Sequence, residues 1–244
     1  ERGYTQDDQV LQAKFEIAML RLLSLVAALM SLLPAAAQHV ASMECGLEEY
    51  RPLLSAAGFE AYAFDIRDFL KNDGRYTVTL RVREYADGRQ IDSTDYVLGE
   101  NKAFLTDYPE EQRSDIFADE AGVVSRAEKL VVGCYPSKVD SIATWMVELQ
   151  DVAQMYPRLS LRSAATDGTQ HYYYISRLFE TVEGVMPGEF IPLVFFGSMW
   201  YDEKYGVYRF CGEQEIAPDL SSEIVSHVPH FYVMGVIFSP TREQ

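Results

Sequence analysis

The chain has 244 residues, of which 48% are hydrophobic and 24% are charged. This apolar fraction excludes an intrinsically disordered chain, and the length allows a sizeable core in one large domain or two small ones. Acidic side chains number 37 against 21 basic ones, and the resulting net charge of −16 argues against binding to nucleic acid or to an anionic membrane surface.

Residues 19–37 have the layout of a secretory signal peptide. Arg21 precedes an uncharged apolar run at 22–33, and a Pro-Ala-Ala-Ala stretch ends at Ala37. The run is shorter than the roughly 20 apolar residues that a transmembrane helix needs. We therefore expect cleavage after Ala37, export from the cytosol and no transmembrane span in the mature chain. Residues 1–18, which precede Met19, are interpreted as an upstream extension that is not native.

Residues 38–59 have weak patterning and predict a loosely ordered arm or a short helix. From residue 60 to residue 244 the dominant period is two, which predicts a single β-sandwich-like domain. The clearest hairpin joins residues 76–84 to residues 89–98 through Asp87-Gly88, a pair that suits a two-residue turn. A turn of this length would place Arg83 opposite Asp92 and Val78 opposite Val97.

Further short strands are separated by turn-like stretches rich in Gly, Pro and Asp. Residues 137–156 fit either a strand or a helical stripe, and the strands predicted on both sides favour a strand over 140–150. Residues 109–120 predict a loop with one helical turn, and residues 200–208 a second hairpin. The predicted fold class is mainly β, an antiparallel β-sandwich with one or two short helices. The other strand candidates are 60–69, 102–106, 128–135, 159–163, 170–179, 190–200, 206–211 and 230–238.

The three cysteines are Cys45, Cys134 and Cys211. An odd number leaves at least one thiol free, and buried free thiols are the simplest expectation. If two of them form a disulfide, Cys134 and Cys211 are the favoured pair because each ends an apolar strand-like run.

No catalytic or metal-binding motif stands out. In His227-Val-Pro-His230 the proline prevents a helix, and in an extended chain residues 227 and 230 point to opposite faces, so they would not converge with His171 on a metal. The acidic residues at 115, 119 and 120 lack the spacing of a calcium loop. We therefore expect no catalytic residues, no metal and no cofactor.

Aromatic residues are unusually dense around the second hairpin. Exposed rings can stack on sugars while neighbouring carboxylates accept hydrogen bonds from sugar hydroxyls, although the same rings also serve core packing. The candidate ligand-binding residues are Trp200, Tyr201, Asp202, Glu203 and Tyr205.

Three strings near the C-terminus carry a family resemblance: FGSMWYDEKYGVYRFCGE at 196–213, EIAPDLSSEI at 215–224 and PHFYVMGV at 229–236. They resemble a family of exported proteins of unknown function from gut Bacteroidales, with a looser match over 75–98. The resemblance implies export from a Gram-negative cell, but it implies no activity, ligand or catalytic residue.

These observations favour an exported, non-catalytic binding or scaffold domain of the bacterial envelope, located in the periplasm or at the cell surface. A glycan or a partner protein is the expected ligand, and nucleic acid is not. The alternatives are a secreted, glycosidase-like hydrolase that uses paired carboxylates, and a purely structural envelope subunit.

Overall fold

The computed structural model describes residues 14–24, 46–135, 139–163 and 172–241. The chain divides into two compact units, Glu1–Gly46 and Leu47–Gln244. In the first unit residues 14–24 are helical, while the predicted cleavage site at Ala37 and the cysteine at 45 lie outside the described residues. Within the described parts, no helix has the length and apolar character needed to cross a membrane.

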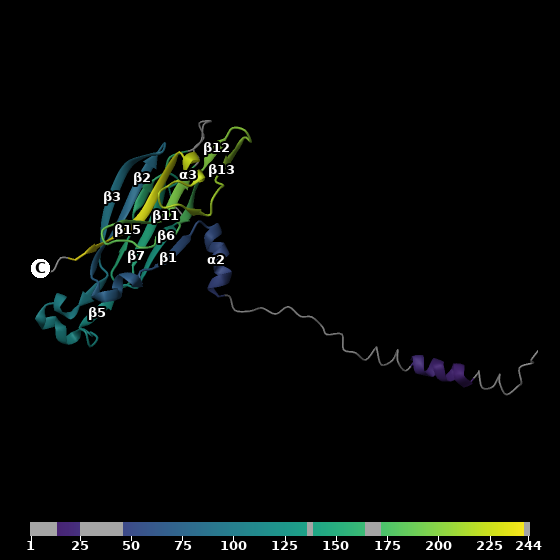
Figure 1. Cartoon of the computed structure of the whole chain (residues 1–244). Helices are drawn as coiled ribbons and strands as arrows, with labels where there is room; N and C mark the ends of the chain where they lie inside the picture. Colours follow the sequence, from purple (N-terminus) through teal and green to yellow (C-terminus); the bar gives the residue numbers. More distant parts are fainter. Residues whose placement is uncertain (1–13, 25–45, 136–138, 164–171, 242–244) are drawn as a thin grey trace, which may run out of the picture. The chain divides into compact units, whose positions relative to one another are not determined.

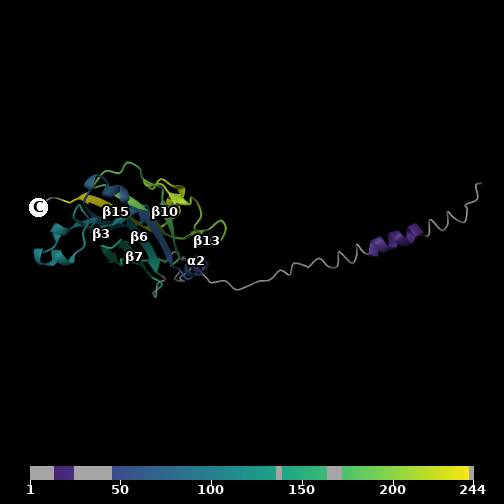
Figure 2. The same ribbon diagram turned by 90° about the horizontal axis from the view of Figure 1, so that it is seen from below.

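The second unit is an antiparallel β-sandwich, as predicted (Figures 1 and 2). One sheet has the strand order β1-β6-β7-β8, with β9 also pairing with β7, and the other has the order β14-β10-β11-β15-β2-β3. The first sheet comprises β1 (Glu60–Asp65), β6 (Lys129–Tyr135), β7 (Ile142–Leu149), β8 (Ala153–Met155) and β9 (Arg158–Ser160). The second comprises β14 (Glu215–Ile216), β10 (Tyr174–Phe179), β11 (Phe190–Ser198), β15 (His230–Pro240), β2 (Tyr76–Ala86) and β3 (Arg89–Glu100).

Short helices and strands lie at the two ends of the sandwich. Figure 1 shows the β12–β13 hairpin and α3 at one end and the β4–β5 ribbon at the other. Their bounds are α2 (Leu47–Ala56), η1 (Arg67–Asp73), β4 (Lys102–Phe104), η2 (Leu105–Asp107), η3 (Glu110–Asp115), β5 (Val123–Arg126), β12 (Trp200–Asp202), β13 (Val207–Arg209) and α3 (Glu223–His227).

The main core lies between the two sheets. Alternate residues of β7 are fully buried there, and Trp145 packs edge-on against Phe196 of the facing sheet, with ring centroids 5.1 Å apart. Leu80 and Met234 contribute from β2 and β15. Alternation thus buries one face of β7 and of the central part of β2, as the period of two predicts.

A second core covers the opposite face of the six-stranded sheet. Phe195 of β11 and Phe231 of β15 stack there, with ring centroids 4.8 Å apart, under Ile224 of α3. Strands β11 and β15 are therefore buried on both faces, and β15 is buried at every position from His230 to Phe238. In the sequence, strands of this kind form unbroken runs of apolar residues rather than alternating apolar and polar ones.

Several sequence predictions are confirmed at the level of elements. The ambiguous 140–150 segment is strand β7, the 109–120 loop contains the helical turn η3, and residues 200–208 form the β12–β13 hairpin. Part of the segment predicted as an arm or short helix is α2.

The 76–98 hairpin is present, but its predicted register is wrong. Irregularities between Glu84 and Tyr85 and between Val78 and Thr79 shift the pairing, so Arg83 lies opposite Ser93 and Val78 lies opposite Gly99. Each bulge inserts one extra residue into β3, which a two-residue turn cannot reveal.

The cross-strand ion pair consequently forms elsewhere than predicted. Arg81 makes two hydrogen bonds of 2.6 Å to Asp95. The predicted partners Arg83 and Asp92 are no longer opposite each other, because Glu84 takes the place across from Asp92.

The pair favoured for a possible disulfide is not bonded. Cys134 and Cys211 are both free thiols. Cys134 lies in β6 of the five-stranded sheet, whereas Cys211 lies two residues beyond the end of β13, which belongs to a different sheet. Cys211 is exposed rather than buried.

Burial of β15 on both faces makes a specific stability prediction. Val233→Ala and Met234→Ala, at adjacent positions pointing into different cores, should each lower the free energy of unfolding by about 1 to 4 kcal/mol. Urea denaturation of the two variants and of Val97→Ala, at a site 65% exposed, measures this. A Val233 or Met234 variant as stable as the Val97 control would contradict the two-core description.

Candidate functional site

A cleft of about 900 Å³ lies at one end of the space between the sheets. Its floor is apolar and is built by residues far apart in the sequence: Phe64 of β1, Phe69 of η1, Leu130 of β6 and Val236 and Phe238 of β15. Phe69 stacks on Phe238 with ring centroids 3.7 Å apart. A concave, largely apolar site with few polar groups is the usual form of a small-molecule site.

Carboxylates alone supply the charge at this cleft. Asp65, Asp68, Glu180 and Glu183 line it, and no Lys, Arg or His among the residues that the structure describes does. Arg67 holds Asp65 through a backbone and a side-chain hydrogen bond of 3.0 and 2.9 Å and lowers the pKa of Asp65 to about 2.

The other three carboxylates differ in their partners. Asp68 forms an ion pair of 2.6 Å with Lys71. Glu180 and Glu183 have no side-chain partner within the part of the chain that the structure describes. Two of the four negative charges at the rim are therefore uncompensated.

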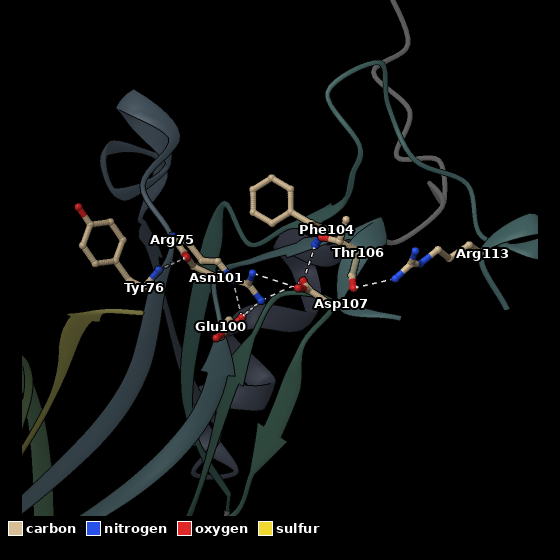
Figure 3. Close-up of polar contacts among 8 residues, drawn as sticks. All are labelled: Arg75, Tyr76, Glu100, Asn101, Phe104, Thr106, Asp107 and Arg113. Atoms are coloured by element: carbon tan, nitrogen blue, oxygen red, sulfur yellow. Dashed lines mark hydrogen bonds and ion pairs between the residues drawn. The ribbon is translucent and has the colours of Figure 1, made fainter. Parts of the chain in front are cut away.

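Asn101 fixes one wall of the cleft (Figure 3). Its side chain is fully buried, accepts a 2.8 Å hydrogen bond from the Tyr76 backbone N–H and donates one of 3.2 Å to the Phe69 carbonyl oxygen. Tyr76 and Phe69 both line the cleft. A buried amide with these partners holds η1 against the start of β2 and keeps the wall preformed.

Arg75 supports the same region from outside. Its guanidinium bonds Glu100 at the end of β3 and Asp107 of η2, the latter at 2.9 Å (Figure 3). Asp107 also accepts a 2.7 Å hydrogen bond from the Phe104 N–H, and Arg113 donates to the Tyr108 carbonyl oxygen at 2.9 Å. The segment between β4 and β5 is thereby tied to the strands beside the cleft.

A buried polar network occupies the opposite end of β15. The Arg162 backbone N–H donates to the Tyr174 hydroxyl at 3.0 Å, Tyr174 donates to His230 Nδ1, and His230 Nε2 donates to Glu84 at 2.9 Å. The Arg162 side chain returns to the same Glu84 oxygen at 3.4 Å, which closes the ring. Neutral His230 with its proton on Nε2 satisfies both contacts, and burial favours the neutral ring by lowering the pKa of His230.

The pKa directions at this end describe hydrogen-bond donors rather than nucleophiles. Burial raises the pKa of the Tyr174 hydroxyl and of the Cys134 thiol to about 12, and it also raises the pKa of Tyr232. Burial lowers the pKa of His230. Nucleophilic catalysis by a tyrosine or a cysteine needs a lowered pKa, so the hydroxyls of Tyr174 and Tyr232 and the thiol of Cys134 stay protonated, while the lowered pKa of His230 favours its neutral ring.

A family profile described as "Domain of unknown function (DUF5041)" matches residues 33–240, which include both sheets, the cleft and the buried network. The chain belongs to the DUF5041 family. No curated protein and no solved structure matches it. Membership confirms that the resemblance is to a family without a known activity, and the DUF5041 description assigns no site residues.

The predicted ligand residues of this DUF5041 domain gather on the β12–β13 hairpin. Trp200 is half-buried and stacks on His227, with ring centroids 5.4 Å apart. Asp202 accepts a 3.0 Å hydrogen bond from the Lys204 N–H and pairs with Arg209, so its carboxylate is occupied within the turn. Tyr205 remains 59% exposed.

The two other hairpin residues also remain near the surface. Tyr201 is 40% exposed and packs edge-on against Tyr208, with ring centroids 5.2 Å apart, and Glu203 is exposed. Ligand binding at this hairpin stays a prediction.

His227 and His230 lie in different surroundings. His227 lies against Trp200, whereas His230 lies in the buried network, and His171 is outside the described residues. The described residues contain no group of three or more potential metal ligands.

Loss of the Asn101 side chain should weaken the whole cleft wall. We expect Asn101→Ala to lower the free energy of unfolding by about 2 to 4 kcal/mol, because it leaves a buried N–H and a buried carbonyl oxygen unpaired. Thermal denaturation measures this loss of stability. Gln154→Ala serves as the control, because Gln154 is exposed on β8 and makes no hydrogen bond with Asn101. An Asn101→Ala variant as stable as that control would show that the amide does not hold the wall.

Stability should also depend on the charge of His230. Its pKa is lowered in the folded state, so the unfolded chain binds more protons and stability falls as the pH drops below about 6.5. Urea denaturation between about pH 7.5 and pH 5.5 should show that the free energy of unfolding falls with pH for the unaltered protein and, with the same slope, for His227→Gln. The slope should be smaller for His230→Gln, and an unchanged slope in that variant would refute the assignment.

Proposed function

We propose that this DUF5041 domain is an exported, non-catalytic binding domain of the bacterial envelope, and that the cleft between its sheets holds the ligand. The signal-peptide layout of residues 19–37 supports export, and the resemblance described above supports a Bacteroidales envelope. The single observation that carries the proposal is the preformed cleft of about 900 Å³. Its volume lies within the range of small-ligand sites.

A glycan is the ligand class that this cleft suits best. Aromatic side chains at its floor and wall, including Phe69 and Tyr76, offer apolar surface to sugar rings. The rim carboxylates of Glu180 and Glu183 accept hydrogen bonds from hydroxyl groups and lack protein partners among the described residues.

A glycosidase-like hydrolase is the competing function, because the cleft does hold several carboxylates. A glycosidase needs one carboxylic acid with a raised pKa beside an ionised partner. Every carboxylate whose pKa is shifted among the described residues is shifted downward, and at the cleft Arg67 keeps Asp65 ionised. This electrostatic arrangement favours binding without hydrolysis.

A glycan array followed by calorimetry tests the proposal. We expect oligosaccharide binding that Val185→Trp, which places an indole in the cleft, weakens at least about tenfold. Val97→Trp, on the exposed face of β3, serves as the matched control and should leave the affinity unchanged. No release of reducing ends should accompany binding.

The hairpin supplies the discriminating comparison. If the cleft is the site, Tyr201→Ala and Tyr205→Ala should leave the affinity unchanged, because both rings lie on the β12–β13 hairpin, whose residues do not line the cleft. Loss of binding in these variants with retention in Val185→Trp would move the site to the hairpin. Hydrolysis of the bound oligosaccharide would replace the binding function with the enzymatic one.

A further inference from the structure

We infer that the cleft selects ligands that carry a positive charge, so that its ligand is a glycan bearing free ammonium groups rather than a neutral or acidic one. The inference rests on the proposed function and names its ligand class. Its basis is the lining: within the described part of the chain, four carboxylates and no basic residue line the cleft beside its apolar floor.

The charges that act on a ligand come from Glu180 and Glu183. Asp65 and Asp68 are balanced by Arg67 and Lys71, whereas the two glutamates have no ion-pair partner among the described residues. The backbone N–H of Glu180 donates a 2.9 Å hydrogen bond to the Ile216 carbonyl oxygen of β14. This bond fixes the backbone of Glu180 at the edge of the cleft.

The surroundings strengthen the attraction for cations. Carboxylates beside a low-dielectric apolar wall interact more strongly with a bound charge than carboxylates on an open surface. Aromatic rings such as Phe69 and Tyr76 also attract cations through their faces. The net charge of −16 adds a long-range field of the same sign, which repels glycans that carry carboxylate or sulfate groups.

Three oligosaccharides of matched length test the charge rule by calorimetry at about pH 6, where amines are protonated and ordinary carboxylates ionised. They are the tetrasaccharides of glucosamine, N-acetylglucosamine and galacturonic acid. We expect the glucosamine oligomer to bind at least about tenfold tighter than its N-acetylated counterpart, and the galacturonate oligomer to bind weakest. Raising the salt concentration should weaken only the binding of the glucosamine oligomer.

Two double variants with the same change in net charge locate the effect. Glu180→Gln with Glu183→Gln should weaken glucosamine-oligomer binding about tenfold and leave the N-acetylated oligomer unaffected. Glu110→Gln with Glu111→Gln, on exposed η3, should change neither.

The outcomes separate the two proposals. If the N-acetylated oligomer binds as tightly as the amine, or if both double variants weaken the amine equally, the charge rule is overturned while a glycan-binding cleft stands. If no oligosaccharide on the array or in this set binds, the glycan-binding function fails and the charge rule fails with it.

Discussion

The fold depends on the pairing of β11 with β15, two strands that are buried on both faces. One face of the pair meets the five-stranded sheet and the other meets the layer that contains α3. The pairing tolerates almost no extra volume: a Cβ at Gly235 would contact the Ile191 carbonyl oxygen and come within 2.6 Å of the Phe190 ring. Glycine at this position allows the two strands to approach and fixes their register.

Strand β15 also runs from the buried polar network at one end of the sandwich to the cleft at the other. His230, at its start, belongs to the closed network with Tyr174 and Glu84, while Val236 and Phe238, near its end, form the floor of the cleft. A strand held on both faces is rigid, and it therefore sets the geometry of both regions at once. The Asn101 amide extends this rigidity to the wall formed by η1.

The sequence predicts the strands well because their signal is local. The Asp87-Gly88 turn predicts the β2–β3 hairpin, whereas alternation over 142–149 predicts β7 only together with the strands expected on both sides of it. The register failed because a bulge next to Glu84 depends on how β3 packs against its neighbours, and no turn residue encodes that.

The cleft could not be predicted for a related reason. Asp65, Glu180 and Phe238 are separated by 50 residues or more and meet only through the sheet order. Residues 180–187 have no periodic pattern that would mark them as a wall. The aromatic cluster at 200–205 is a strong local signal by contrast, yet its carboxylate at Asp202 is used to close its own turn.

The difference between the two ends of β15 explains why one of them is the better candidate for recognition. At the His230 end, Glu84 receives hydrogen bonds from both His230 and Arg162, and the network closes on the Tyr174 hydroxyl. A ligand would have to break these bonds, and each buried group left unpaired would cost about 1 to 3 kcal/mol. At the cleft, Glu180 and Glu183 are already exposed to solvent and have no such bonds to other described residues. Recognition at the cleft therefore requires only that water be displaced, which makes the open end of the sandwich the energetically accessible one.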